Sequence, residues 1–123
     1  MYTYYHITPT KNVSRILRYG LRPASEHGLG LSSLKGENVR GKIHVTGSEE
    51  EARDIVCSQY LERWSESEPN WTVLRLLTAE RGKVDPGFGG FEGFYYLSRP
   101  VPPRNIEEVR NYGDEEGCFV PLS

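Results

Sequence analysis

The sequence is poor in cysteine and has no long apolar run. Its two cysteines, Cys57 and Cys118, lack CxxC or Cys/His ligand spacing, which argues against a disulfide framework and a zinc site. We expect free thiols in a reducing, cytoplasmic setting. No stretch approaches the roughly 20 apolar residues of a membrane helix, and residues 1–10 lack the regions of a signal peptide. We therefore expect a soluble, unsecreted protein with no metal and no membrane partner.

An excess of charge of one sign is also missing. Fifteen basic and 17 acidic residues leave a net charge of −2, which argues against a protein that holds nucleic acid by bulk positive charge. This net charge does not exclude a nucleic acid substrate that binds at one local site. The Walker loop, GxGxxG, GxSxG and HExxH are absent, so nucleotide binding by those routes is disfavoured.

What the chain does contain is enough apolar material for one core. Its 123 residues are 37% hydrophobic, with 8 Tyr, 4 Phe and 2 Trp, so we expect a single domain over residues 1–123. The 13 Gly and 8 Pro concentrate in residues 20–47 and 82–103. We expect ordered, functional loops there, above all the long loop 22–41.

The periodicity predicts an α+β domain. Residues 2–8 alternate as a strand, and the spacing of Val13, Ile16 and Leu17 predicts a helix that begins near a Thr cap and ends at Gly20. A Ser48/Glu51 capping box starts a second helix. Further strands are predicted at 42–46, 71–77, 94–97 and, at the sheet border, 119–122. We expect a small split mixed sheet with two main helices.

Polar side chains on two predicted strands are the first candidates for a site. His6 and Thr8 share one face of the first strand, and His44 and Thr46 share one face of the next. A polar side facing a cleft would explain both pairs. The ordinary alternative for His6 is a hydrogen-bonded strand histidine without a ligand.

Charged residues in glycine-rich segments add further candidates. Glu92 lies between glycines where an aromatic strand begins, although a solvated turn glutamate would look the same. Arg22 and Arg40 lie in the long loop, where guanidinium groups suit a bidentate grip on phosphate. The acidic residues gather elsewhere, in 49–68 and 107–116, which permits an anion site beside the first two strands.

Three blocks resemble a known family. The segments YHIT at 5–8 and YGLRP at 19–23 resemble the opening of the ADP-ribosyltransferase fold superfamily. KIHVT at 42–46, EAR at 51–53 and Tyr60 resemble the next strand and helix of poly(ADP-ribose) polymerase-type domains. FEGFYY at 91–96 resembles the late strand that carries their catalytic glutamate. The order and spacing of these blocks carry the resemblance.

The resemblance implies a transferase that uses NAD as substrate, releases nicotinamide and passes ADP-ribose to a protein or nucleic acid acceptor. It implies that His6 binds a ribose of NAD, that Tyr60 stacks on nicotinamide, and that Glu92 contacts the ribose 2′-hydroxyl. A carboxylate suits this reaction because breaking the glycosidic bond builds positive charge on the ribose. The expected catalytic residues are Glu92, His6 and His44. The expected NAD-binding residues are His6, Thr8, Arg22, Arg40, His44 and Tyr60.

Departures from the family pattern keep other functions open. His44 stands where polymerase-like members carry a tyrosine, so an inactive NAD-binding or nucleotide-binding module is one alternative. RGKIHV at 40–45 resembles a segment of NAD-dependent RNA 2′-phosphotransferases, in which Arg40 and His44 would matter more than Glu92. Gly90 stands two positions before Glu92, so the arginine-modifying toxin signature is absent. A plain protein-interaction domain is the last alternative.

Overall fold

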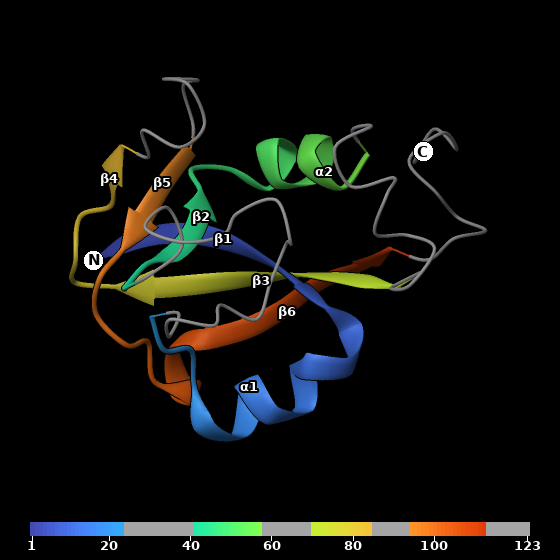
Figure 1. Cartoon of the computed structure of the whole chain (residues 1–123), viewed down its shortest axis with the longest axis horizontal. Helices are drawn as coiled ribbons and strands as arrows, with labels where there is room; N and C mark the ends of the chain where they lie inside the picture. Colours follow the sequence, from blue (N-terminus) through green and yellow to red (C-terminus); the bar gives the residue numbers. More distant parts are fainter. Residues whose placement is uncertain (24–40, 58–69, 85–93, 113–123) are drawn as a thin grey trace.

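The computed structural model describes residues 1–23, 41–57, 70–84 and 94–112 (Figure 1). Their centre is a six-stranded sheet with the strand order β4-β5-β2-β1-β3-β6. The strands are β1 (Tyr2–Pro9), β2 (Ile43–Thr46), β3 (Trp71–Thr78), β4 (Lys83–Val84), β5 (Phe94–Leu97) and β6 (Ile106–Tyr112). The helices are α1 (Val13–Tyr19) and α2 (Glu49–Cys57), with short 3-10 turns η1 (Thr10–Asn12) and η4 (Pro103–Asn105).

This architecture fits the expected small α+β class, with one difference in the sheet. Every strand pairing in the described residues is antiparallel, whereas we expected a mixed sheet. Helix α1 lies against one face of the sheet and α2 against the other (Figure 1). Antiparallel neighbours need no crossover helix between them, which fits the small number of helices in the described residues.

Alternation along β1 separates two clusters of buried side chains. Tyr4 belongs to the main core, which includes Val13 and Ile16 of α1. Tyr5 and Ile7 point to the other face and pack against a smaller cluster around Ala52 of α2. The strand therefore divides its side chains between the two helices, as the period of two requires. Strand β3 lies between β1 and β6 and is largely buried, which confirms its predicted central place.

Helix α1 ends at Gly20, as predicted. Gly20 has φ +86°, and its N–H donates to the Ile16 carbonyl at 2.7 Å. The expected Thr cap at the helix start is wrong, since no described side chain caps this end. The Thr10 hydroxyl instead donates to Thr72 Oγ1 at 2.9 Å, because the Thr72 proton goes to Asn111 Oδ1 at 2.7 Å.

Helix α2 begins with the predicted capping box. The Glu51 N–H donates to Ser48 Oγ at 3.1 Å. The Glu51 carboxylate accepts a hydrogen bond from the Gly47 N–H at 3.2 Å. In a standard capping box the donor would be the N–H of the next residue, Ser48. Side chain and backbone thus satisfy donors that the helix itself leaves open.

The C-terminal part of the sheet differs from prediction. The strand at 106–112 was not expected, because Glu107, Glu108 and Arg110 are exposed and little in its sequence looks apolar. It forms an edge of the described sheet, where charged residues are usual. The short β4 was also missed. The predicted strand at 119–122, Cys118 and most of the loop 22–41 lie outside the described residues.

Candidate functional site

The candidate site is centred on a split between β1 and β2. In the described residues these strands are joined by one register pair, Tyr5 opposite Thr46, whereas β1 and β3 pair from Tyr2 to Pro9. After Tyr5, the contact between the two strands is made by a side chain instead of the backbone. His6 Nδ1 lies 2.7 Å from the His44 carbonyl oxygen. A histidine ring therefore replaces part of the ladder between two neighbouring strands.

The bond fixes the tautomer of His6 when its ring is neutral. A carbonyl oxygen only accepts, so Nδ1 carries the proton and donates. Nε2 then keeps its lone pair and is a hydrogen-bond acceptor. Such an acceptor suits a hydroxyl group, including a hydroxyl of ribose.

Burial keeps this imidazole neutral at physiological pH. Desolvation lowers the pKa of His6 from 6.5 to about 4. The bond to the His44 carbonyl opposes this lowering of the pKa, and the electrostatic effect of the His44 side chain adds to it. The loss of water is the largest of these causes, so His6 is uncharged at pH 7.

His44 and His6 lie on neighbouring strands, but their side chains leave the sheet on opposite faces. Ile43 and Val45 belong to the main core, so His44 and Thr46 point to the α2 side, which confirms their predicted shared face. His6 lies opposite Leu74, another residue of that core. Its side chain therefore leaves the strand on the face that α1 covers. Contrary to our expectation, the two histidine side chains therefore do not share one polar face of the sheet. Their contact is the hydrogen bond between the His6 ring and the His44 backbone carbonyl.

The other predicted site residues are not gathered at this split by any described contact. Thr8 is 3% exposed and its hydroxyl lies 3.4 Å from the Pro9 carbonyl, so a ligand contact by Thr8 stays a prediction. Arg22 is exposed and follows Leu21, which pairs with Val101. Arg40, Tyr60 and Glu92 lie outside the described residues, and their roles also stay predictions.

A shallow pocket of about 220 Å³ opens on the stretch of β1 that precedes His6. The rings of Tyr2 and Tyr4 stack at 6.5 Å, and the Tyr4 hydroxyl accepts the Gly82 N–H at 2.7 Å. The lining residues are Tyr2, Thr3, Tyr4, Gly47, Arg81, Gly82 and Tyr95. Ligand pockets are usually about 300–1,000 Å³, so this one would hold only a fragment of a dinucleotide.

A row of basic and aromatic side chains lies beside His44 and was not predicted from the sequence. Tyr96 of β5 lies opposite His44 on one side and Lys83 of β4 on the other. The Lys42 and Lys83 ammonium groups lie 4.8 and 5.8 Å from the Tyr96 ring centroid. The alternation of β5 shows that Tyr95 and Tyr96 face opposite ways, but only the strand order brings the two lysines to the same ring.

No group of three or more His, Cys, Asp or Glu among the described residues is placed to hold a metal ion. None of the helices in these ranges is long and apolar enough to cross a membrane. Comparison with protein-family models and with curated proteins found no match to this chain.

Proposed function

We propose that the protein transfers ADP-ribose from NAD to a protein or nucleic acid acceptor and releases nicotinamide. The observation that supports this most is the state of His6. The histidine singled out by the resemblance is a neutral imidazole with a fixed tautomer, held at a split between two central strands. A rigid acceptor of this kind suits a ribose hydroxyl that must be held in one orientation.

The reaction breaks the bond between ribose C1′ and the nicotinamide nitrogen. The electron pair of that bond leaves with nicotinamide, and an acceptor nucleophile forms a new bond to C1′ and loses its proton. We propose that His6 positions a ribose and that Glu92 stabilises the positive charge that develops on the ribose. Tyr60 would hold the planar leaving group by stacking, and Arg22 and Arg40 would bind the pyrophosphate.

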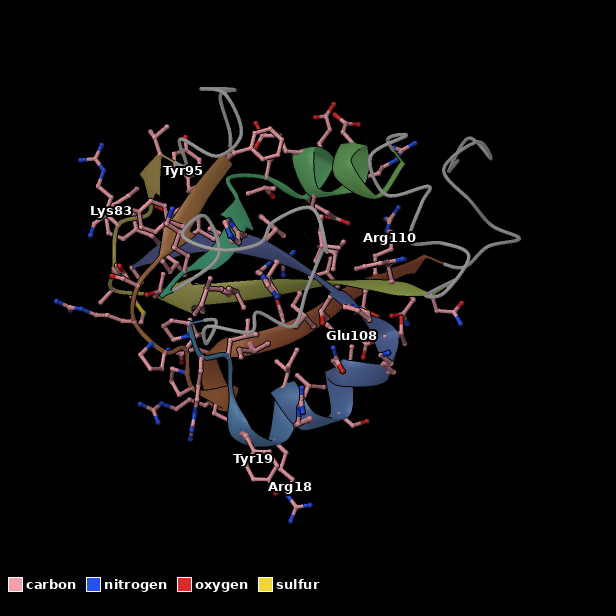
Figure 2. The ribbon with its side chains drawn as sticks, viewed as in Figure 1. Arg18, Tyr19, Lys83, Tyr95, Glu108 and Arg110 are labelled. Carbon is pink, nitrogen blue, oxygen red and sulfur yellow. The ribbon has the colours of Figure 1, made fainter. Side chains whose placement is uncertain are left out.

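The test is nicotinamide release from NAD by the full chain. We expect Glu92→Gln to reduce release by about 100-fold or more, in line with the loss of a group that stabilises charge in a transition state. Glu108→Gln is the matched control, because Glu108 is an exposed carboxylate on β6 (Figure 2). Equal release by wild type and Glu92→Gln, or no release at all, would contradict the proposal.

One observation favours a second candidate, the transfer of an RNA 2′-phosphate to NAD. His44 lies opposite Tyr96, whose ring carries the Lys42 and Lys83 ammonium groups, and such surroundings suit a phosphate. This function predicts that loss of a 2′-phosphate from RNA depends on Arg40 and His44 more than on Glu92. A chain that NAD stabilises against heat without any turnover would be an inactive binding module.

A further inference from the structure

We propose that Lys42, Lys83 and Tyr96 form a binding surface for single-stranded nucleic acid, which we name the basic row. The three side chains come from separate places in the chain: Lys42 precedes β2, Lys83 begins β4 and Tyr96 lies within β5. The antiparallel pairing of β5 with both other strands brings them together. Two ammonium groups thereby share one aromatic ring.

In the part of the chain that the structure describes, no carboxylate forms an ion pair with the lysines of the basic row. Among the described residues, the ion pairs Arg75–Glu107 and Arg110–Glu49 involve neither lysine. The carboxylate of Glu80 in the turn before β4 is already bound by Ser98 and by the Arg99 N–H. Among the described residues, the two ammonium groups are therefore available to an anion.

The basic row is also accessible. Lys83 is exposed, and Lys42 and Tyr96 are half-buried. Helix α2 packs against β1, β2 and β3, while β4 and β5 lie to one side of it (Figure 1). Figure 2 shows Lys83 at the outer edge of this end of the sheet. A strand of nucleic acid can reach this surface without displacing a helix.

The combination of cations and one ring favours a single strand over a duplex. Two lysines suit neighbouring phosphates, and a tyrosine ring suits stacking with a base. Only an unpaired strand offers both groups together, because bases in a duplex are already stacked. The overall charge of −2 makes a local site necessary, since bulk attraction to a polyanion is absent.

Binding can be measured by fluorescence anisotropy, with a labelled 12-nucleotide single strand, the full chain and no NAD. Contact with two phosphates predicts that affinity falls about sevenfold between 50 and 200 mM salt. We expect the double variant Lys42→Gln/Lys83→Gln to lose this salt dependence. Tyr96→Leu should weaken binding by about fivefold or more through the lost stacking.

The matched control removes two charges from another part of the surface. Arg15 and Arg18 are exposed on α1, and Arg18 also rests on a tyrosine ring, that of Tyr19 (Figure 2). The double variant Arg15→Gln/Arg18→Gln should bind like wild type, and Lys42→Arg/Lys83→Arg should retain affinity. Thermal melting of each variant checks that it is folded.

Three results would overturn the proposal: no binding at 50 mM salt, equal affinity for a duplex of the same length, or equal losses in the α1 control and the basic-row variant. The assay contains no NAD, so its failure leaves nicotinamide release untouched. Failure of nicotinamide release would likewise leave this binding result intact.

Discussion

His6 of β1 and the backbone of His44 in β2 are joined by a 2.7 Å hydrogen bond across the split in the sheet. The bond ties a half-buried, uncharged imidazole to a strand that β1 otherwise meets at Tyr5 and Thr46. A single side chain therefore serves the sheet and supplies the acceptor on which the proposed chemistry depends. Stability and activity should both respond to changes at this position.

His6 should make stability depend on pH between about 4 and 6.5. The pKa of His6 is lowered to about 4 in the folded chain from an ordinary value of 6.5, so the unfolded chain binds more protons in this window. Stability should therefore rise with pH across it. Urea unfolding at pH 4.5 and 7.5 should show a contribution from His6 of about 2 kcal/mol.

The variant His6→Gln isolates that contribution, because an amide still donates a hydrogen bond but does not titrate. We expect its free energy of unfolding to change less between the two pH values than that of wild type. If both proteins show the same change, His6 is not the source of the pH dependence of stability.

Gly20→Ala should destabilise the fold by about 2 kcal/mol. Gly20 has φ +86°, and an added Cβ would lie 2.5 Å from the Val101 carbonyl oxygen. Strain in the backbone and the clash with backbone atoms should both contribute. Chemical denaturation measures the loss.

Gly41→Ala is the control for the clash. Gly41 has φ +71°, but none of the described residues around it comes within 4 Å of the added Cβ. We expect a loss of about 1 kcal/mol from backbone strain alone. Equal losses at the two positions would show that contact with Val101 is unimportant.

Glu80→Gln should weaken the connection between the turn before β4 and the end of β5. Burial acts to raise the pKa of Glu80, but hydrogen bonds from the Ser98 hydroxyl and the Ser98 and Arg99 N–H groups outweigh it and lower the pKa. The carboxylate therefore stabilises the fold at neutral pH, and this contribution is lost as the pH falls below the ordinary value of 4.5.

At pH 7 we expect Glu80→Gln to lose about 1 kcal/mol of unfolding free energy. Glu108→Gln, which alters an exposed carboxylate on β6, should change stability by less than about 0.5 kcal/mol. A loss for Glu80→Gln that persists unchanged at acid pH would point to a cause other than the charged hydrogen bonds.

Local signals predicted much of this fold. The end of α1 at Gly20 and the Ser48/Glu51 capping box of α2 were predictable, because each depends on backbone geometry within a few residues. Strand β6 was not, because an exposed edge strand needs few apolar residues. The mixed sheet predicted from the order of helices and strands was not found, since the described pairings are antiparallel throughout.

The candidate site was less predictable than the fold. His6 and His44 were both singled out, but the sequence did not indicate that they meet through a backbone carbonyl from opposite faces. The basic row was missed because Lys42, Lys83 and Tyr96 are far apart in sequence. Such contacts depend on strand order and register, which local patterns do not determine.

The decisive experiment on the proposed role of His6 is nicotinamide release from NAD at pH 7.5 by wild type and His6→Gln. We expect wild type to release nicotinamide and the folded variant to do so at least about tenfold more slowly, because the Gln amide oxygen does not reproduce the position of the imidazole Nε2 that would hold the ribose. No release by the wild type, or the same rate in both proteins, would contradict this role.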